Sequence, residues 1–249
     1  LINIQGTVNL LEGIRRHNLA IPTVVVTSDK CYRNKEIGES FVESDALGGG
    51  DPYSASKACQ DIVAESMCQS LFSGEGRIAT ARAGNAIGGG DWATDRLVPD
   101  IVRSVFKGGR IELRYPNAVR PWQYVLEPIS GYLALAERLS TEPSISFSAF
   151  NFGPPIESAI PVRSFVTQFG EALGQRLQVD VCEVPEKEAG LLRLNSNKAY
   201  QKLNWKPRID LTGSISETVR WYKRVSTGES PRKLSLEAIS RFEDMQRSD

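Results

Sequence analysis

The sequence predicts an α/β fold in which helices connect the strands of a parallel sheet. Apolar residues recur at helical spacing over residues 3–18 and 52–72, and β-branched or apolar runs occupy residues 23–28 and 77–84. An alternation of strand, helix and strand is typical of parallel pairing, because each connection must cross over the sheet. A polar loop follows each strand, so both loops are expected at one edge of the sheet, where open α/β folds bind ligands.

The composition indicates a globular protein with a sizeable core. The 249 residues are 41% hydrophobic and 24% charged, and 30 Lys and Arg balance 30 Asp and Glu. This balance argues against a broad positive field for nucleic acid or an anionic membrane, so the expected partner is a small molecule. The longest apolar runs fall well short of the roughly 18 residues of a membrane-spanning helix, and no leader pattern opens the chain. We expect a cytoplasmic protein.

The cysteines and the single histidine exclude several kinds of chemistry. Cys31, Cys59, Cys68 and Cys182 have no CxxC spacing, so we expect reduced, mostly buried thiols rather than disulfides or a zinc site. His17 lies in a helical stretch and is expected to be an ordinary helix-end residue. Serine–histidine catalysis and most metal chemistry are therefore not expected, and we predict no metal.

The first elements follow directly from these patterns. A helix is predicted over 3–18 and a strand over 23–28, then a loop of about 20 residues that ends in "GGGDP". The helix over 52–72 has an N-cap at Asp51 and a proline at its first position. A strand over 77–84 then leads into "GNAIGGGDW".

Beyond residue 90 the pattern is less regular. Further helices are predicted over 96–108, 127–140, 161–174, 196–203 and 212–225, and strands over 110–114, 148–153 and 178–184. We assign residues 1–85 to a sheet domain, 86–227 to an interleaved substrate-binding lobe with returning sheet elements, and 228–249 to a polar tail that frays or forms a peripheral helix.

The start of the chain resembles the middle of a crossover. A helix comes first without a preceding strand, and no G-x-G-x-x-G loop occurs anywhere. Either the domain binds no dinucleotide or its N-terminal part is missing, and we favour the second explanation.

Tyr53 and Lys57 are the first candidates for catalysis. They stand four residues apart on one helix face, close to the helix N-terminus. A nearby ammonium and the positive potential of the helix end favour a phenolate, so the tyrosine could exchange a proton near neutral pH. The alternative is a surface tyrosine that stacks on a lysine stem.

Together with its neighbours, this pair resembles the extended short-chain dehydrogenase/reductase family. The runs that carry the resemblance are "NIQGTVNLLE", "TSDKCY", "LGGGDPYSASK", "RAGNAIGGGDWATDRLVPD" and "RPWQYVLEP", and they cover the chain to about residue 225. Within the family they look like the branch of nucleotide-sugar 4,6-dehydratases that act on CDP-glucose. The resemblance implies a Rossmann-like doubly wound parallel sheet, here without its N-terminal strands and Gly-rich loop, and a smaller interleaved lobe.

The resemblance also implies an activity with NAD as cofactor. Such enzymes oxidise the sugar at C4, eliminate water across C5 and C6, and return the hydride to C6, as a step toward the deoxysugars of lipopolysaccharide. Tyr53 would remove the 4-hydroxyl proton, and Lys57 would hold the cofactor ribose beside Thr27. Ser28 would bond the 4-oxygen, and a protonated Asp29 would donate to the leaving 6-hydroxyl.

Lys30 occupies the place where TDP-glucose relatives carry Glu, the base that removes the C5 proton. A lysine acts as a base only when it is uncharged, and Asp29 beside it favours the charged form. Two roles therefore stay open for Lys30. It either removes the proton itself or stabilises the enolate while water or another group does so.

Substrate contacts are expected from the later runs. Asn85 is placed to bond a diphosphate or sugar oxygen, and the glycines of "GGGDW" would allow close backbone approach. Arg96 and Arg120 could clamp the diphosphate by bidentate bonds. For each arginine, the alternative is a solvated residue of a helix or strand.

Three functions compete. The leading one is the dehydratase, a lyase that is expected to form a homodimer when full length and to be inactive as this fragment alone. Another nucleotide-sugar enzyme of the family, such as a TDP- or GDP-sugar dehydratase or a 4-epimerase, is the second, although Asp29 argues against an epimerase. A non-catalytic nucleotide-sugar-binding protein is the third, and the Tyr53–Lys57 pair argues against it.

Overall fold

The chain forms two compact units that exchange segments along the sequence. The computed structural model describes residues 2–34, 38–72, 77–108, 110–142, 145, 147–182 and 190–247. Unit 1 comprises residues 1–84, 128–153 and 192–206, and unit 2 comprises residues 85–127, 154–191 and 207–249. The sheet elements that return after residue 86 are thus the segments 128–153 and 192–206, and the segment from residue 228 is part of unit 2.

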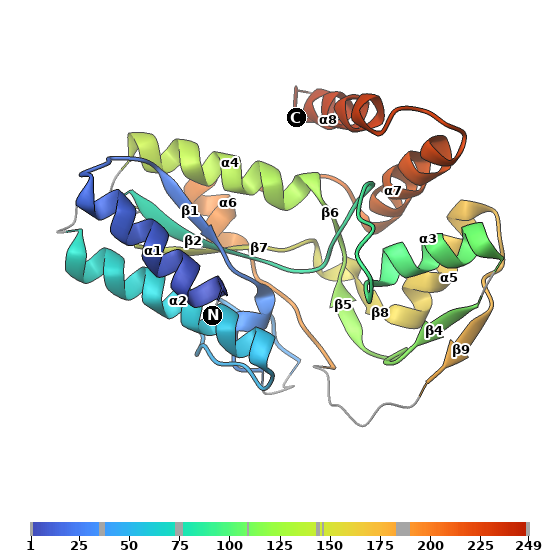
Figure 1. The fold of residues 1–249 in the computed structure, drawn as a ribbon, viewed down its shortest axis with the longest axis horizontal. Helices are drawn as coiled ribbons and strands as arrows, with labels where there is room; N and C mark the ends of the chain where they lie inside the picture. Colours follow the sequence, from blue (N-terminus) through green and yellow to red (C-terminus); the bar gives the residue numbers. More distant parts are fainter. Residues whose placement is uncertain are drawn as a thin grey trace. The chain divides into compact units, whose positions relative to one another are not determined.

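Unit 1 is built on a parallel sheet of three strands, β1 (Thr23–Val26), β2 (Ile78–Ala83) and β7 (Ala149–Phe152), in the order β1-β2-β7. Val24 lies opposite Ala79, and Ala81 lies opposite Phe150. The predicted α/β class with parallel pairing is confirmed. Since the strands run in the same direction, the loops after β1 and β2 leave from one edge (Figure 1).

Helices cover both faces of this sheet. The helices α1 (Ile2–Arg16) and α2 (Pro52–Leu71) pack on one face, and α4 (Leu126–Thr141) and α6 (Asn197–Leu203) pack on the other (Figure 1). Alternation along β2 explains this division, because Ile78 joins the core under α1 and α2 while Ala79 and Ala81 join the core under α4 and α6.

Unit 2 has four helices and three pairs of short strands among its described residues. The strand β3 (Ala86–Ile87) pairs with β6 (Gln123–Tyr124), β4 (Ile111–Leu113) with β9 (Val179–Val181), and β5 (Val119–Pro121) with β8 (Ala159–Pro161). The helices are α3 (Leu97–Lys107), α5 (Val162–Leu173), α7 (Leu211–Ser226) and α8 (Pro231–Arg247). The described residues also form short 3-10 turns at η1 (Asp29–Cys31) in unit 1 and η3 (Ile156–Ser158) in unit 2.

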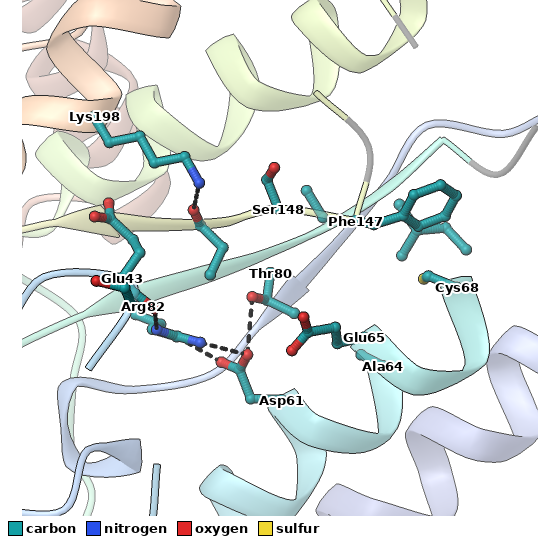
Figure 2. A pocket seen from close by; sticks show the side chains of 14 residues that line it. Glu43, Asp61, Ala64, Glu65, Cys68, Thr80, Arg82, Phe147, Ser148 and Lys198 are labelled. Carbon is teal, nitrogen blue, oxygen red and sulfur yellow. Dashed lines mark hydrogen bonds and ion pairs between the residues drawn. The ribbon is translucent and has the colours of Figure 1, made fainter. Parts of the chain in front are cut away.

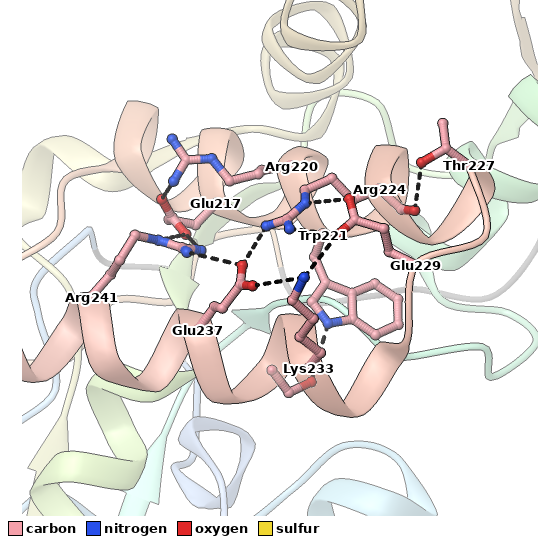
Figure 3. Close-up of polar contacts among 10 residues, drawn as sticks. Glu217, Arg220, Trp221, Arg224, Thr227, Glu229, Lys233, Glu237 and Arg241 are labelled. Carbon is pink, nitrogen blue, oxygen red and sulfur yellow. Dashed lines mark hydrogen bonds and ion pairs between the residues drawn. The ribbon is translucent and has the colours of Figure 1, made fainter.

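The polar tail forms α8, which packs on unit 2. Its Leu234 and Phe242 are buried in two clusters of that unit. Ion pairs reinforce this packing, since Arg224 of α7 binds Glu229 at 2.6 Å and also contacts Glu237 of α8 (Figure 3). The segment from residue 231 is therefore a helix that buries one face, not a frayed tail.

The four cysteines are free thiols that differ in their burial. Cys31 and Cys68 are buried, Cys182 is partly buried, Cys59 is exposed, and all four are free thiols. Burial raises the pKa of the Cys31 thiol to about 12.

Within the described ranges, no helix is long and apolar enough to cross a membrane.

Candidate active site

The polar residues after β1 form a compact capped turn. Ser28 caps the short helix η1, and its Oγ accepts a hydrogen bond from the Lys30 amide at 3.2 Å. The same hydroxyl donates to Asp29 Oδ1 at 3.0 Å. Ser28 is 7% exposed and Asp29 is 3% exposed. The turn therefore fixes a hydroxyl and a carboxyl group together beyond the carboxyl end of β1.

The second group of candidates begins α2. Asp51 caps this helix by accepting from the Ser54 amide at 3.0 Å. Partial burial raises the pKa of the Asp51 carboxyl, but the bonds from the Ser54 hydroxyl and amide lower it more, so it lies below its usual range. Tyr53 follows in the first turn and is 51% exposed. A phenol is thus presented at a helix N-terminus, as the sequence predicts.

Lys57 of α2 links this helix to the end of β1, where the turn with Ser28 and Asp29 begins. Its Nζ donates to the Val26 carbonyl, at the end of β1, at 3.2 Å and to Gln60 Oε1 at 3.0 Å. Burial lowers the pKa of the Lys57 ammonium. Because α2 packs against η1, the structure brings all the predicted catalytic residues to the carboxyl end of β1: Ser28, Asp29, Lys30, Tyr53 and Lys57.

Thr27 lies between β1 and this turn, and its side chain points into the protein. Its hydroxyl donates to Asp61 Oδ2 of α2 at 2.9 Å. Asp61 in turn forms a buried ion pair with Arg82 of β2, with Nε–Oδ2 and Nη2–Oδ1 distances of 2.8 Å (Figure 2). Thr80, the neighbour of Arg82 on the same face of β2, donates to Asp61 Oδ1 at 3.1 Å.

The residue that follows the turn, Tyr32, also contacts the Asp61–Arg82 ion pair. Tyr32, directly after η1, accepts from Arg82 Nη1 at 2.9 Å and donates to Asn151 Oδ1 of β7 at 2.7 Å. Burial raises the pKa of the Tyr32 phenol well above its usual range. Asp61, Arg82 and Tyr32 are not among the site residues predicted from the sequence. An available signal was the arginine inside the apolar strand "RIATARAG", because a buried charge requires a partner.

A cavity of about 260 Å³ lies beside this ion pair, between α2, β2 and β7 (Figure 2). Asp61, Thr80 and Arg82 form one wall, and Glu43 and Lys198 line it as well. None of the described residues that line it belongs to the predicted active site. The cavity is therefore distinct from the group at the end of β1.

The predicted substrate residues all lie in unit 2. Asn85 precedes β3, and its carbonyl accepts from the Gln123 amide at 3.0 Å. The side chain of Arg96 is 67% exposed and pairs with Asp91 at 3.3 Å. Arg120 in β5 is only 3% exposed, and its Nη1 donates to the Val119 carbonyl at 2.9 Å. Burial excludes the alternative of a solvated strand residue for Arg120.

The "GGGDW" loop is held by α7. A Cβ at Gly89 would lie 2.1 Å from the Trp221 ring, so the backbone packs directly on that indole. The Tyr222 hydroxyl donates to the Asp91 carbonyl at 2.6 Å. Its ring also meets Trp92 edge-on, with 5.2 Å between the centroids. In this structure, the close approach that requires a glycine is therefore to a side chain of the protein.

Comparisons with known proteins show the family of this chain. A family model described as GDP-mannose 4,6 dehydratase matches residues 1–218. The CDP-glucose 4,6-dehydratase of Salmonella typhimurium strain LT2 is 41% identical over 251 residues, which cover 96% of this chain and 69% of that protein. The dTDP-glucose 4,6-dehydratase of Streptomyces griseus is 26% identical over 224 residues, or 89% and 64% of the two proteins. The chain spans about two thirds of the length of these curated relatives.

Solved structures show the same fold. The dTDP-glucose 4,6-dehydratase of Bacillus anthracis in complex with NAD has a TM-score of 0.77 and 23% identity, covering 92% of this chain and 70% of that one. The UDP-glucuronic acid 4-epimerase of Bacillus cereus, in complex with UDP-glucuronic acid and NAD, has a TM-score of 0.78 and 15% identity, with 90% and 68% coverage. The predicted Rossmann-like fold is confirmed.

Proposed function

The chain belongs to the GDP-mannose 4,6 dehydratase family of short-chain dehydrogenase/reductase enzymes, and from this premise we propose that it carries the active site of an NAD-dependent hydro-lyase that converts CDP-glucose to CDP-4-keto-6-deoxyglucose. The choice of CDP-glucose rests on the 41% identity to the Salmonella enzyme. The observation that carries the chemistry is the bond from Lys57 to the Val26 carbonyl, which joins the Tyr53 helix to the strand before Ser28.

The donor set at the end of β1 fits the nicotinamide ribose of NAD. Lys57 supplies an ammonium group, and Tyr53 supplies a hydroxyl one helical turn away on the same face. Both groups can donate hydrogen bonds to the ribose hydroxyls. Thr27, which the sequence places on the cofactor side, is 6% exposed and donates its hydroxyl proton to Asp61, so we propose that it supports this site from within the protein rather than binding NAD. Bound there, NAD would supply the hydride acceptor for oxidation at C4 and the hydride donor for C6.

The protein residues then divide the proton transfers among themselves. Tyr53 takes the proton of the 4-hydroxyl, and Ser28 donates a hydrogen bond to the same oxygen. Asp29, in its protonated form, gives its proton to the 6-hydroxyl, which leaves as water when the C5 proton has been removed. Lys30 acts at C5, either as the base or as the cation beside the enolate. In this structure the single hydroxyl proton of Ser28 is donated to Asp29, so the hydroxyl would turn from that carboxylate to the 4-oxygen when the sugar binds.

For substrate binding we propose Asn85, Arg96 and Arg120. Arg120 is a buried cation and Arg96 an exposed one, so they suit the inner and outer parts of a diphosphate site. Asn85 offers an amide side chain beside β3.

We also propose that the protein is a cytoplasmic homodimer that serves the synthesis of lipopolysaccharide deoxysugars. The exposed apolar residues of α1 and α2 support the dimer, because Leu10 is 57% and Ile62 is 50% exposed.

The test is a comparison of nucleotide sugars with the natural protein and NAD. CDP-, TDP- and GDP-glucose, and GDP-mannose, are supplied separately, and the product is identified by mass and NMR spectroscopy. We expect a 4-keto-6-deoxy sugar from CDP-glucose at least about tenfold faster than from the other three. Tyr53→Phe should abolish the reaction. A C4 epimer that keeps its 6-hydroxyl would establish an epimerase instead, and faster turnover of another nucleotide would overturn the specificity.

A further inference from the structure

We propose that the buried Asp61–Arg82 ion pair is a positioning device for catalysis, which holds the segment Ser28–Lys30 in register with Tyr53 and Lys57. The inference rests on the proposed function for the roles of those residues. It assigns Asp61, Arg82, Thr27 and Tyr32 a part in the reaction through the catalytic groups, without contact with the substrate.

The position of Asp61 on α2 is the first step. Tyr53, Lys57 and Asp61 follow at intervals of four residues, so they lie along one face of the helix. That face points toward β1, because Lys57 reaches the Val26 carbonyl and Asp61 reaches the Thr27 hydroxyl. Two consecutive turns of the catalytic helix are thus bonded to two consecutive residues that lead into Ser28.

Both ends of the catalytic segment are tied to the ion pair. Thr27 precedes the segment and donates to Asp61 at 2.9 Å, and Tyr32 follows it and accepts from Arg82 at 2.9 Å. The four residues between these anchors include Ser28, Asp29 and Lys30. A displacement of α2 relative to β1 would therefore strain both anchors together.

The energetics favour positioning over stability as the use of this pair. Asp61 is 2% and Arg82 is 3% exposed, and buried ion pairs are often no more stabilising than apolar residues of similar volume. What the pair provides is fixed geometry, since Asp61 receives four hydrogen bonds on its two oxygens. Catalytic groups need such support, because their geometry must hold to within about 0.5 Å.

Two threonines give a matched test. Thr27 and Thr80 are both buried and both donate to Asp61, but only Thr27 adjoins the catalytic segment. We expect Thr27→Val to lower kcat about 10- to 100-fold with the KM of CDP-glucose and the affinity for NAD nearly unchanged. Thr80→Val should lower kcat less than about twofold, although both lose one hydrogen bond to the same carboxylate. Thr27→Ser should restore most of the rate.

A measurement on the free protein complements the kinetics. Hydrogen exchange of the amides from Asp29 to Tyr32 should be faster in Thr27→Val than in Thr80→Val, while their melting temperatures fall by similar amounts. Tyr32→Phe, which loosens the other anchor, should resemble Thr27→Val in both measurements and guards against misfolding of one variant.

Three results would overturn the proposal. Equal losses of kcat in Thr27→Val and Thr80→Val would make the pair merely structural, and weaker NAD binding with normal kcat would make Thr27 a cofactor ligand. Unchanged exchange from Asp29 to Tyr32 would show that the segment is not anchored by Thr27. Failure of the parent protein to dehydrate CDP-glucose would refute the proposed function, yet the exchange comparison would still test the anchoring.

Discussion

At the scale of single residues, Lys30 is the proposed catalytic residue for which two roles stay open. The residue is partly buried in η1, next to Asp29, and its backbone amide donates a hydrogen bond to Ser28 Oγ. In the site that we propose, this backbone holds the Lys30 side chain beside C5 of the sugar. A cation there either gives up a proton to act as a base or stabilises the negative charge of the enolate.

Two substitutions separate these roles. Lys30→Ala should abolish exchange of the C5 proton with solvent yet spare oxidation at C4, because Tyr53 and Ser28 act at the other carbon. Lys30→Arg keeps the charge but is too weak an acid to cycle as a base. If Lys30 is the base, both variants should lose C5 exchange more than about 100-fold. If it stabilises the enolate, Lys30→Arg should retain much of the exchange. C5 exchange followed by NMR in deuterated water decides this, and normal elimination in Lys30→Ala would exclude either role.

At the scale of elements, α2 carries most of the proposed chemistry and depends on its first turn. Asp51 caps it, Pro52 occupies its first position, and Tyr53 follows directly. A frayed first turn would move Tyr53 away from Lys57, because the four-residue spacing aligns them only in a helix. Stability of the cap and placement of the phenol are therefore linked.

This link gives a prediction about pH. Asp51→Ala should lower the free energy of unfolding by about 1 kcal/mol near neutral pH, through the loss of the cap. Since the pKa of Asp51 is lowered in the folded protein, its contribution is complete above the ordinary aspartate pKa of ~3.9 and is lost as the pH falls through the lowered value. Urea unfolding of both proteins between about pH 7 and pH 3 measures this. In the control, Asp51→Asn, the advantage over alanine should not depend on pH, and a wild-type advantage that grows toward acid would contradict the assignment.

At the scale of the whole molecule, the two units are each assembled from three stretches of chain. Unit 1 holds the proposed catalytic and cofactor-binding residues, and unit 2 holds the proposed substrate-binding residues. The apolar residues left exposed on α1 and α2 belong to unit 1. A dimer through this face would support the helix that carries Tyr53 and Lys57.

The dimer can be tested by one substitution on each face of unit 1. Leu10 of α1 is 57% exposed, and Leu133 of α4, on the opposite face of the sheet, is 67% exposed. Leu10→Glu should convert the natural protein to a monomer in sedimentation experiments, because a charge cannot be buried in an apolar interface without a partner. Leu133→Glu should leave the dimer intact. A monomeric parent protein, or dissociation only in the α4 variant, would refute the α1–α2 interface.

The elements of the fold could be predicted where the pattern is local and long. The helices α1, α2, α5 and α7 and the strands β1, β2 and β7 lie within one or two residues of their predicted bounds, because periodicity over a whole element averages out single exceptions. The two-residue strands β3 and β6 carry no period and were missed, whereas the three-residue strands β4 and β9 lie within the predicted strands 110–114 and 178–184. The helix α8 was only an alternative to a frayed tail, since its few apolar residues become informative only when α7 lies beside them.

The sequence by itself determined the parallel α/β class, the start of α2 at Asp51, and the placement of Tyr53 and Lys57 on one helix face, because each depends on neighbours within one or two turns. The tertiary structure decided which residues support them. Thr27 and Asp61 are separated by 34 residues, and Asp61 and Arg82 by 21. Their bonds exist only because α2 packs on the sheet face that β1 and β2 share, an arrangement set by burial of apolar faces that no local spacing encodes.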